Sequence, residues 1–113
     1  MRDTAYKALD AVVPTADRTS EALKTAGATK VSMSADWSGG TTVGSLILQV
    51  SNDAVNWFTV KDLDDADIAI AVSGSSGTGY VAAYEVIGKF VRAFYDRTSD
   101  GTGAELNAIV YVC

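Results

Sequence analysis

The chain has 113 residues, 48% hydrophobic and 20% charged, with 9 Lys and Arg residues against 14 Asp and Glu residues and no His. This length is typical of one domain with a modest core. The net charge of -5 argues against sequence-independent nucleic-acid binding and against attachment to anionic membranes, because both need a basic face. Without histidine, the commonest general base and the commonest zinc ligand are missing.

The first 18 residues differ in pattern from the rest of the chain. Their apolar side chains are scattered, and the only proline, Pro14, would end a helix there. The segment 1–18 is interpreted as an N-terminal arm, either a short helix or extended, ahead of a β domain at 19–113. It lacks the apolar stretch and cleavage site of a signal peptide, so synthesis in the cytoplasm is expected.

From residue 19 onward, strands alternate with turns. Residues 30–37 have strict period two, which predicts a strand with one buried and one wet face. Residues 45–51 and 57–60 predict a hairpin, because the intervening 52–56 has the composition of a turn.

The second half of the chain shows the same alternation of short strands and turns. Residues 67–73 predict a strand, and the Gly- and Ser-rich stretch 73–79 predicts a loop. Further strands are predicted at 80–86, 89–97 and 105–113, with a loop at 98–103. Seven or eight short strands and no convincing helix predict an all-β fold, a single antiparallel β-sandwich or jelly roll.

Four aspartates fall within the six residues 62–67. Asp62, Asp64 and Asp65 could supply oxygen ligands to a hard cation such as calcium. The glycine and the closing glutamate of an EF-hand loop are missing. A solvated acidic turn is therefore the favoured interpretation, and neither a metal nor another cofactor is predicted.

Residues 51–57 are the most distinctive stretch. Asn52 and Asp53 can cap their own turn through side-chain hydrogen bonds, and Trp57 can anchor the hairpin. Trp37 lies on the apolar face of its strand and is predicted to be a core residue.

A second interpretation of the same stretch is a glycan site, in which an aromatic ring stacks on a sugar while polar groups bind its hydroxyls. The residues in this interpretation are Trp57, Tyr80 or Tyr84 for stacking, and Asn52, Asp53 and Asn56 for hydrogen bonding.

No catalytic residue is predicted. Serine and threonine have no histidine partner, and no Ser-Lys arrangement stands out. The glycine-rich stretches lack the lysine of a phosphate loop. The single cysteine, Cys113, cannot form an intrachain disulfide. The chain is therefore predicted not to be an enzyme.

Three stretches resemble small β-sandwich structural proteins encoded by tailed bacteriophages. Residues 48–57, LQVSNDAVNW, are similar to their LQxSNDGxNW hairpin, with Ala54 where glycine is usual. Residues 35–40 resemble their WxG segment, and KFVRAFY at 89–95 followed by SDGTG resembles their KYVRxxY…SGTG ending. A related hairpin occurs in discoidin-like jelly rolls, whose cysteine pair is missing here.

This resemblance implies a non-enzymatic virion structural protein, in particular a capsid decoration or cement protein. Its implied partners are further copies of itself and a major capsid or other virion protein, with neither nucleic acid nor membrane. An alternative is a carbohydrate-binding module of a tail or vertex component. The arm is expected to supply assembly contacts, through Tyr6, Leu9, Val12 and Val13.

Overall fold

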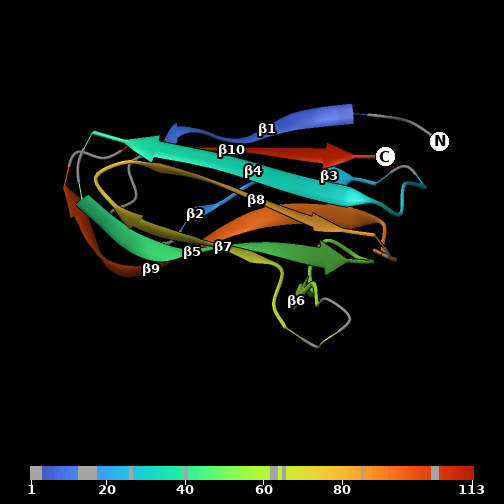
Figure 1. The fold of residues 1–113 in the computed structure, drawn as a ribbon. Helices are drawn as coiled ribbons and strands as arrows, with labels where there is room; N and C mark the ends of the chain where they lie inside the picture. Colours follow the sequence, from blue (N-terminus) through green and yellow to red (C-terminus); the bar gives the residue numbers. More distant parts are fainter. Residues whose placement is uncertain are drawn as a thin grey trace.

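The computed structural model describes residues 4–12, 18–25, 27–39, 41–61, 64, 66–84, 86–102 and 105–113. Within these residues, ten strands form two antiparallel sheets that pack against each other (Figure 1). The predicted all-β sandwich is confirmed. Three strands of only two residues each raise the number above the seven or eight expected. The described residues include no helix that could span a membrane.

The first sheet has four strands. In spatial order they are β1 (Thr4–Val12), β10 (Glu105–Val112), β4 (Val31–Ser38) and β8 (Gly77–Ala83). The full register of β10 with β4 runs from Glu105 opposite Ser38 to Val112 opposite Val31.

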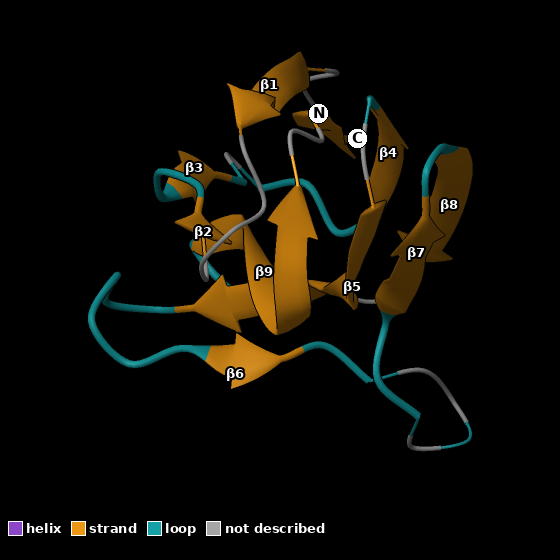
Figure 2. Ribbon diagram, turned by 90° about the vertical axis from the view of Figure 1, so that its left-hand side faces the viewer, coloured by secondary structure: helices purple, strands orange, loops and turns teal. Residues whose placement is uncertain are grey.

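The second sheet has six strands. Its main path is β2 (Arg18–Thr19), β9 (Phe90–Thr102), β5 (Thr41–Ser51) and β6 (Phe58–Thr59), while β3 (Leu23–Lys24) also pairs with β9 and β7 (Ala69–Gly74) also pairs with β5. The turn between β7 and β8 passes the chain from this sheet to the four-stranded one (Figure 2).

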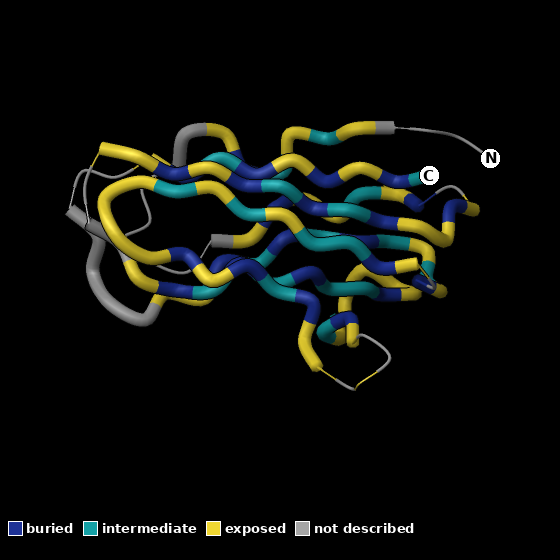
Figure 3. The backbone as a smooth tube through the Cα atoms, in the orientation of Figure 1, coloured by how far each residue is buried: buried dark blue, intermediate teal, exposed yellow. Residues whose placement is uncertain are grey.

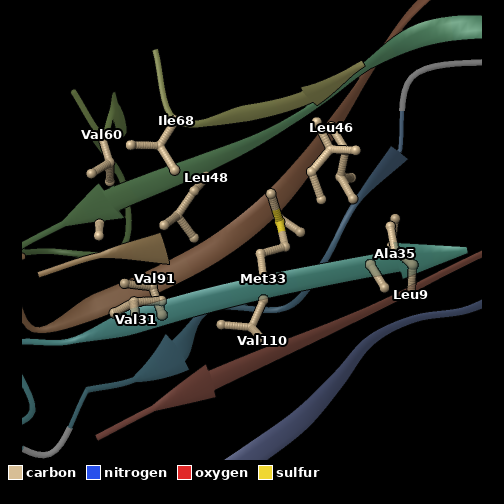
Figure 4. Packing of buried hydrophobic residues seen from close by; sticks show 14 of the residues in the cluster. Leu9, Val31, Met33, Ala35, Leu46, Leu48, Val60, Ile68, Val91 and Val110 are labelled. Atoms are coloured by element: carbon tan, nitrogen blue, oxygen red, sulfur yellow. The ribbon is translucent and has the colours of Figure 1, made fainter. Parts of the chain in front are cut away.

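The core lies between the sheets. Buried and exposed residues alternate along the strands (Figure 3), as the period-two pattern predicts. Met33 of the four-stranded sheet packs among Leu46, Leu48 and Val91 of the other sheet (Figure 4). Each fully buried side chain of this size contributes about 1.5–3 kcal/mol of transfer free energy.

Trp37 belongs to this core, as predicted. It is 5% exposed, and its indole Nε1 donates a hydrogen bond to the Ser73 carbonyl at 3.0 Å. A buried indole N–H needs such a partner. The bond joins β4 of one sheet to β7 of the other.

The loop predicted at 73–79 is wrong at both ends, because Ser73 and Gly74 belong to β7 and the two glycines Gly77 and Gly79 belong to β8. A Cβ on Gly77 would lie 2.4 Å from Cζ2 of Trp37, and one on Gly79 would lie 2.3 Å from Cγ2 of Ile70. These glycines leave room for large neighbours rather than making a loop. The loop predicted at 98–103 is also wrong, because β9 continues through these residues to Thr102.

The N-terminal segment is extended, not helical, over Thr4–Val12. This strand, β1, pairs along β10 with two irregularities in register, between Lys7 and Leu9 and between Leu9 and Val12. Leu9 is 4% exposed and belongs to the core of its own chain. The Tyr6 hydroxyl donates to the Lys24 carbonyl at 3.4 Å. This part of the predicted arm therefore packs on its own sandwich, while Val13 lies outside the described residues.

Candidate functional site

The turn between β5 and β6 is organised by Asp53. Its Oδ1 accepts hydrogen bonds from the backbone N–H groups of Asn56 at 2.8 Å and Val55 at 2.9 Å, and from the Ser51 hydroxyl at 3.0 Å. Its Oδ2 accepts from the Asn56 amide at 2.9 Å. The predicted capping is confirmed for Asp53. These bonds, with the backbone N–H of Asn56 first, hold the pKa of Asp53 well below its ordinary value.

Ala54 adopts a left-handed conformation in this turn, with φ of 60°. A residue with a Cβ is disfavoured there by about 1–2 kcal/mol relative to the right-handed region. Glycine adopts this conformation without the same cost, because it has no Cβ. The turn keeps its shape here because Ser51 and Asp53 bind the surrounding backbone N–H groups.

Trp57 is held by a neighbour that the sequence pattern does not reveal. The Arg92 guanidinium carbon lies 4.3 Å from the centroid of the Trp57 ring, which is a cation–π contact. Arg92 Nε also donates to Gln49 Oε1 at 2.7 Å. Burial lowers the pKa of Arg92.

The structure therefore brings only part of the predicted glycan site together. Asp53, Asn56 and Trp57 are close, but their polar atoms and one ring face serve the turn and Arg92. Tyr80 lies on β8 in the four-stranded sheet, whereas Trp57 precedes β6 of the other sheet. Tyr80 is therefore on a different sheet from the hairpin residues, and the glycan site at the hairpin stays a prediction.

Residues 86–89, which lie between β8 and β9, cross one end of the sandwich. Val86 N–H donates to the Thr29 carbonyl at 2.8 Å, and Lys89 N–H donates to the Ser51 carbonyl at 3.0 Å. Val86 is buried in the core, but Ile87 is 86% exposed. The segment thus closes the core with one apolar side chain and presents the next one to solvent.

Two large apolar side chains in the segments that follow β5 are also exposed. Phe58 is 66% exposed and is the register partner of Val50, and a Cβ on Gly88 would touch Val50 as well. Val55, which is 77% exposed, belongs to the turn that follows β5. We call Val55, Phe58 and Ile87 the end patch. Large apolar side chains exposed together mark a surface that contacts another macromolecule.

A basic hollow lies near the end patch. This cavity of about 420 Å³ is lined by Lys24, Thr25, Gly27, Gly88, Lys89 and Phe90. The Thr25 hydroxyl donates to the Gly88 carbonyl at 2.8 Å, which fixes the hollow against the crossing segment. Two lysines therefore border the apolar end of a chain whose net charge is -5.

The predicted calcium ligands are only partly described. Asp62 and Asp65 lie outside the described residues, and Asp64 is exposed. The neighbouring Asp67 forms a salt bridge with Lys61. In the described part of the chain, no three His, Cys, Asp or Glu side chains are placed to hold a metal ion.

Fold and surface together define a β-sandwich with a tightly bonded hairpin turn and an apolar end. The chain matches no known protein-family profile and no curated protein. Its fold is similar to that of the SPBc2 prophage-derived protein YomS, with 15% identity over 99% of this chain and 94% of YomS and a TM-score of 0.57.

Two other solved structures show weaker similarity. The K1 cleaved adhesin domain of Lys-gingipain from Porphyromonas gingivalis W83 has 10% identity over 86% of this chain and 62% of that domain, with a TM-score of 0.46. The N-terminal cellulose-binding domain of Cellulomonas fimi β-1,4-glucanase C has 14% identity over 98% of this chain and 86% of that domain, with a TM-score of 0.39.

Proposed function

We propose that this chain is a non-enzymatic structural protein of a phage virion, a decoration protein that attaches to the capsid surface. The observation that carries the proposal is the end patch, because Val55, Phe58 and Ile87 expose most of their apolar surface. The phage-type hairpin motif at 48–57 supports it. So does the fold shared with a protein named as prophage-derived.

The free energy of attachment favours a partner surface that binds many copies of the chain side by side. Burying each of the three side chains contributes about 1.5–3 kcal/mol, against a cost of association of about 4–15 kcal/mol. A single patch therefore binds weakly, and contacts between adjacent copies on the shell add affinity through high effective concentration. The lysines beside the patch, Lys24 and Lys89, suit an acidic rim on the partner.

Peptide counting on gradient-purified phage particles of the source tests this function. A copy number comparable with that of the major capsid protein is expected for a decoration protein. A few copies per particle would favour the tail or vertex alternative. Absence from the particles would refute a virion role.

A second experiment tests the end patch itself. The double substitution Phe58→Ser and Ile87→Ser should abolish rebinding of the purified protein to particles from which it has been removed. Val43→Ser is the matched control, because Val43 is a partly exposed apolar residue near the opposite end of β5. Equal rebinding of the double variant and the wild type would refute attachment through this patch.

A further inference from the structure

The outer face of the four-stranded sheet carries a trough along β4. The side chains of β4 that point outward are short, and they belong to Ser32, Ser34, Asp36 and Ser38. In register beside Ser34 stand Ile109 of β10 and Tyr80 of β8. Large side chains on the two flanking strands therefore rise on either side of a small polar floor.

Two depressions follow this trough. One, of about 250 Å³, is lined by Ser34, Asp36, Thr78, Asn107 and Ile109, with the backbone of neighbouring residues. The other, of about 200 Å³, is lined by Lys30, Ser32, Tyr80, Ala82, Tyr84 and Tyr111, among others. Both lie between β10 and β8, so they form a single path over β4.

The walls offer aromatic rings. Tyr80 is 67% exposed, and Tyr84 and Tyr111 are also exposed. A tyrosine ring presents an apolar face together with a hydroxyl group that can donate or accept a hydrogen bond. Such rings suit a ligand that has a flat C–H face and polar edges.

The floor offers hydrogen-bonding groups to match. Ser32 and Ser34 are half-buried, and each hydroxyl can both donate and accept hydrogen bonds. At one end, Asn107 Nδ2 donates to Asp36 Oδ1 at 3.0 Å, which orients the carboxylate across the strands. A carboxylate so placed accepts hydrogen bonds from further donors.

The charged side chains that line the trough favour an uncharged ligand. One carboxylate, Asp36, and one ammonium group, Lys30, stand at opposite ends of the trough, so their charges balance. The other side chains of the lining are neutral. An uncharged ligand that is rich in hydroxyl groups can bind here without bringing an unpaired charge of its own into the interface.

An extended peptide fits less well. Backbone groups of β4 are already paired with β10 and β8 on both sides. A peptide on this face would find no strand edge for its own N–H and C=O groups, which is where peptides add to sheets. The hydroxyls of a sugar need only side chains and water.

We infer that the trough is a binding site for a neutral oligosaccharide that lies along β4, with Tyr80 stacked on a sugar ring. The path from Lys30 to Asp36 spans about 20 Å at the rise of a β-strand, which is the length of a short oligosaccharide. This site is distinct from the end patch and does not depend on the proposed attachment to a capsid.

The test uses the full-length chain, labelled with ¹⁵N, and three probes: cellohexaose, maltohexaose and N-acetylchitohexaose. At least one should shift the amide resonances of Ser32, Ser34 and Tyr80, and a polygalacturonate oligomer should not. Tyr80→Ala should weaken the binding on the order of tenfold, equal to about 1.4 kcal/mol. Phe58→Ala is the matched control, an equally exposed aromatic residue on the other sheet, and should bind as the wild type does.

The proposal has three outcomes that would overturn it. They are no binding of any neutral probe, resonance shifts confined to the hairpin turn instead of β4, or equal binding by Tyr80→Ala and the wild type. Because Tyr80 is exposed, its replacement should leave the spectrum of the unliganded fold otherwise unchanged. The variant Ser34→Val provides a second check on the same site, since it removes a floor hydroxyl without removing a ring.

Discussion

Replacing Gly77 with alanine should destabilise the fold through Trp37. The added Cβ would lie 2.4 Å from Cζ2 and 2.7 Å from Cε2 of the indole, whereas carbon atoms in contact are normally separated by about 3.5–4.0 Å. The ring must therefore move by more than a small adjustment. Movement of the ring also disturbs the hydrogen bond from its Nε1 to the Ser73 carbonyl.

The expected loss can be worked from these contacts. Inserting a methyl group into a packed core costs about 1–3 kcal/mol, and the hydrogen bond contributes about 1 kcal/mol. Alanine recovers about 0.5–1 kcal/mol relative to glycine in a strand. The free energy of unfolding should fall by about 2 kcal/mol, which lowers the melting temperature by about 8 °C for a domain of this size.

Urea unfolding followed by far-ultraviolet circular dichroism measures this loss, and a double-mutant cycle assigns it. Phenylalanine lacks the indole atoms that lie closest to Gly77. In the background of Trp37→Phe, the Gly77→Ala substitution should therefore cost less than about 1 kcal/mol. Equal losses in the two backgrounds would refute the explanation that Gly77 makes room for the indole.

Three further predictions concern the hairpin turn and its neighbour. Ala54→Gly should raise the free energy of unfolding by about 0.5–1 kcal/mol, because φ at this residue is left-handed; a thermal melt measures it, and a lower melting temperature would contradict it. Since hydrogen bonds depress the pKa of Asp53 from 3.8, its stabilising effect is present above that pH and should be lost as the pH falls further. Asp53→Asn should flatten this acid dependence in urea titrations, and an unchanged dependence would count against it. Arg92→Ala should expose Trp57 to acrylamide quenching in the Trp37→Phe background, because the guanidinium covers one ring face; unchanged quenching would argue against that contact.

Local patterns in the sequence predict much of this fold. The alternation over 30–37 identifies β4 within one residue of its observed bounds, and it places Trp37 in the core. When one face of a strand is buried and the other is exposed to solvent, apolar and polar residues alternate in the sequence, so the strand can be predicted from that alternation. The turn after β5 can also be predicted from local sequence, because Asp53 binds backbone groups only two and three residues away.

Features that depend on pairing between strands far apart in the sequence cannot be predicted from local patterns. Gly77 has the local composition of a loop, yet it lies in a strand because its partner is Trp37. The contact between Arg92 and Trp57 depends on the pairing of β9 with β5, which local periodicity does not specify. The trough on the four-stranded sheet likewise requires the order β10, β4, β8.

The irregular pairing of β1 has a consequence for crowded copies of the chain. Among the described strands, β1 lies at one edge of its sheet, where an even row of backbone groups would recruit a neighbouring molecule and extend the sheet indefinitely. Two breaks in register and the charged pair Lys7 and Asp10 disturb that row. Copies held side by side at high density should therefore stay discrete instead of joining into fibrils.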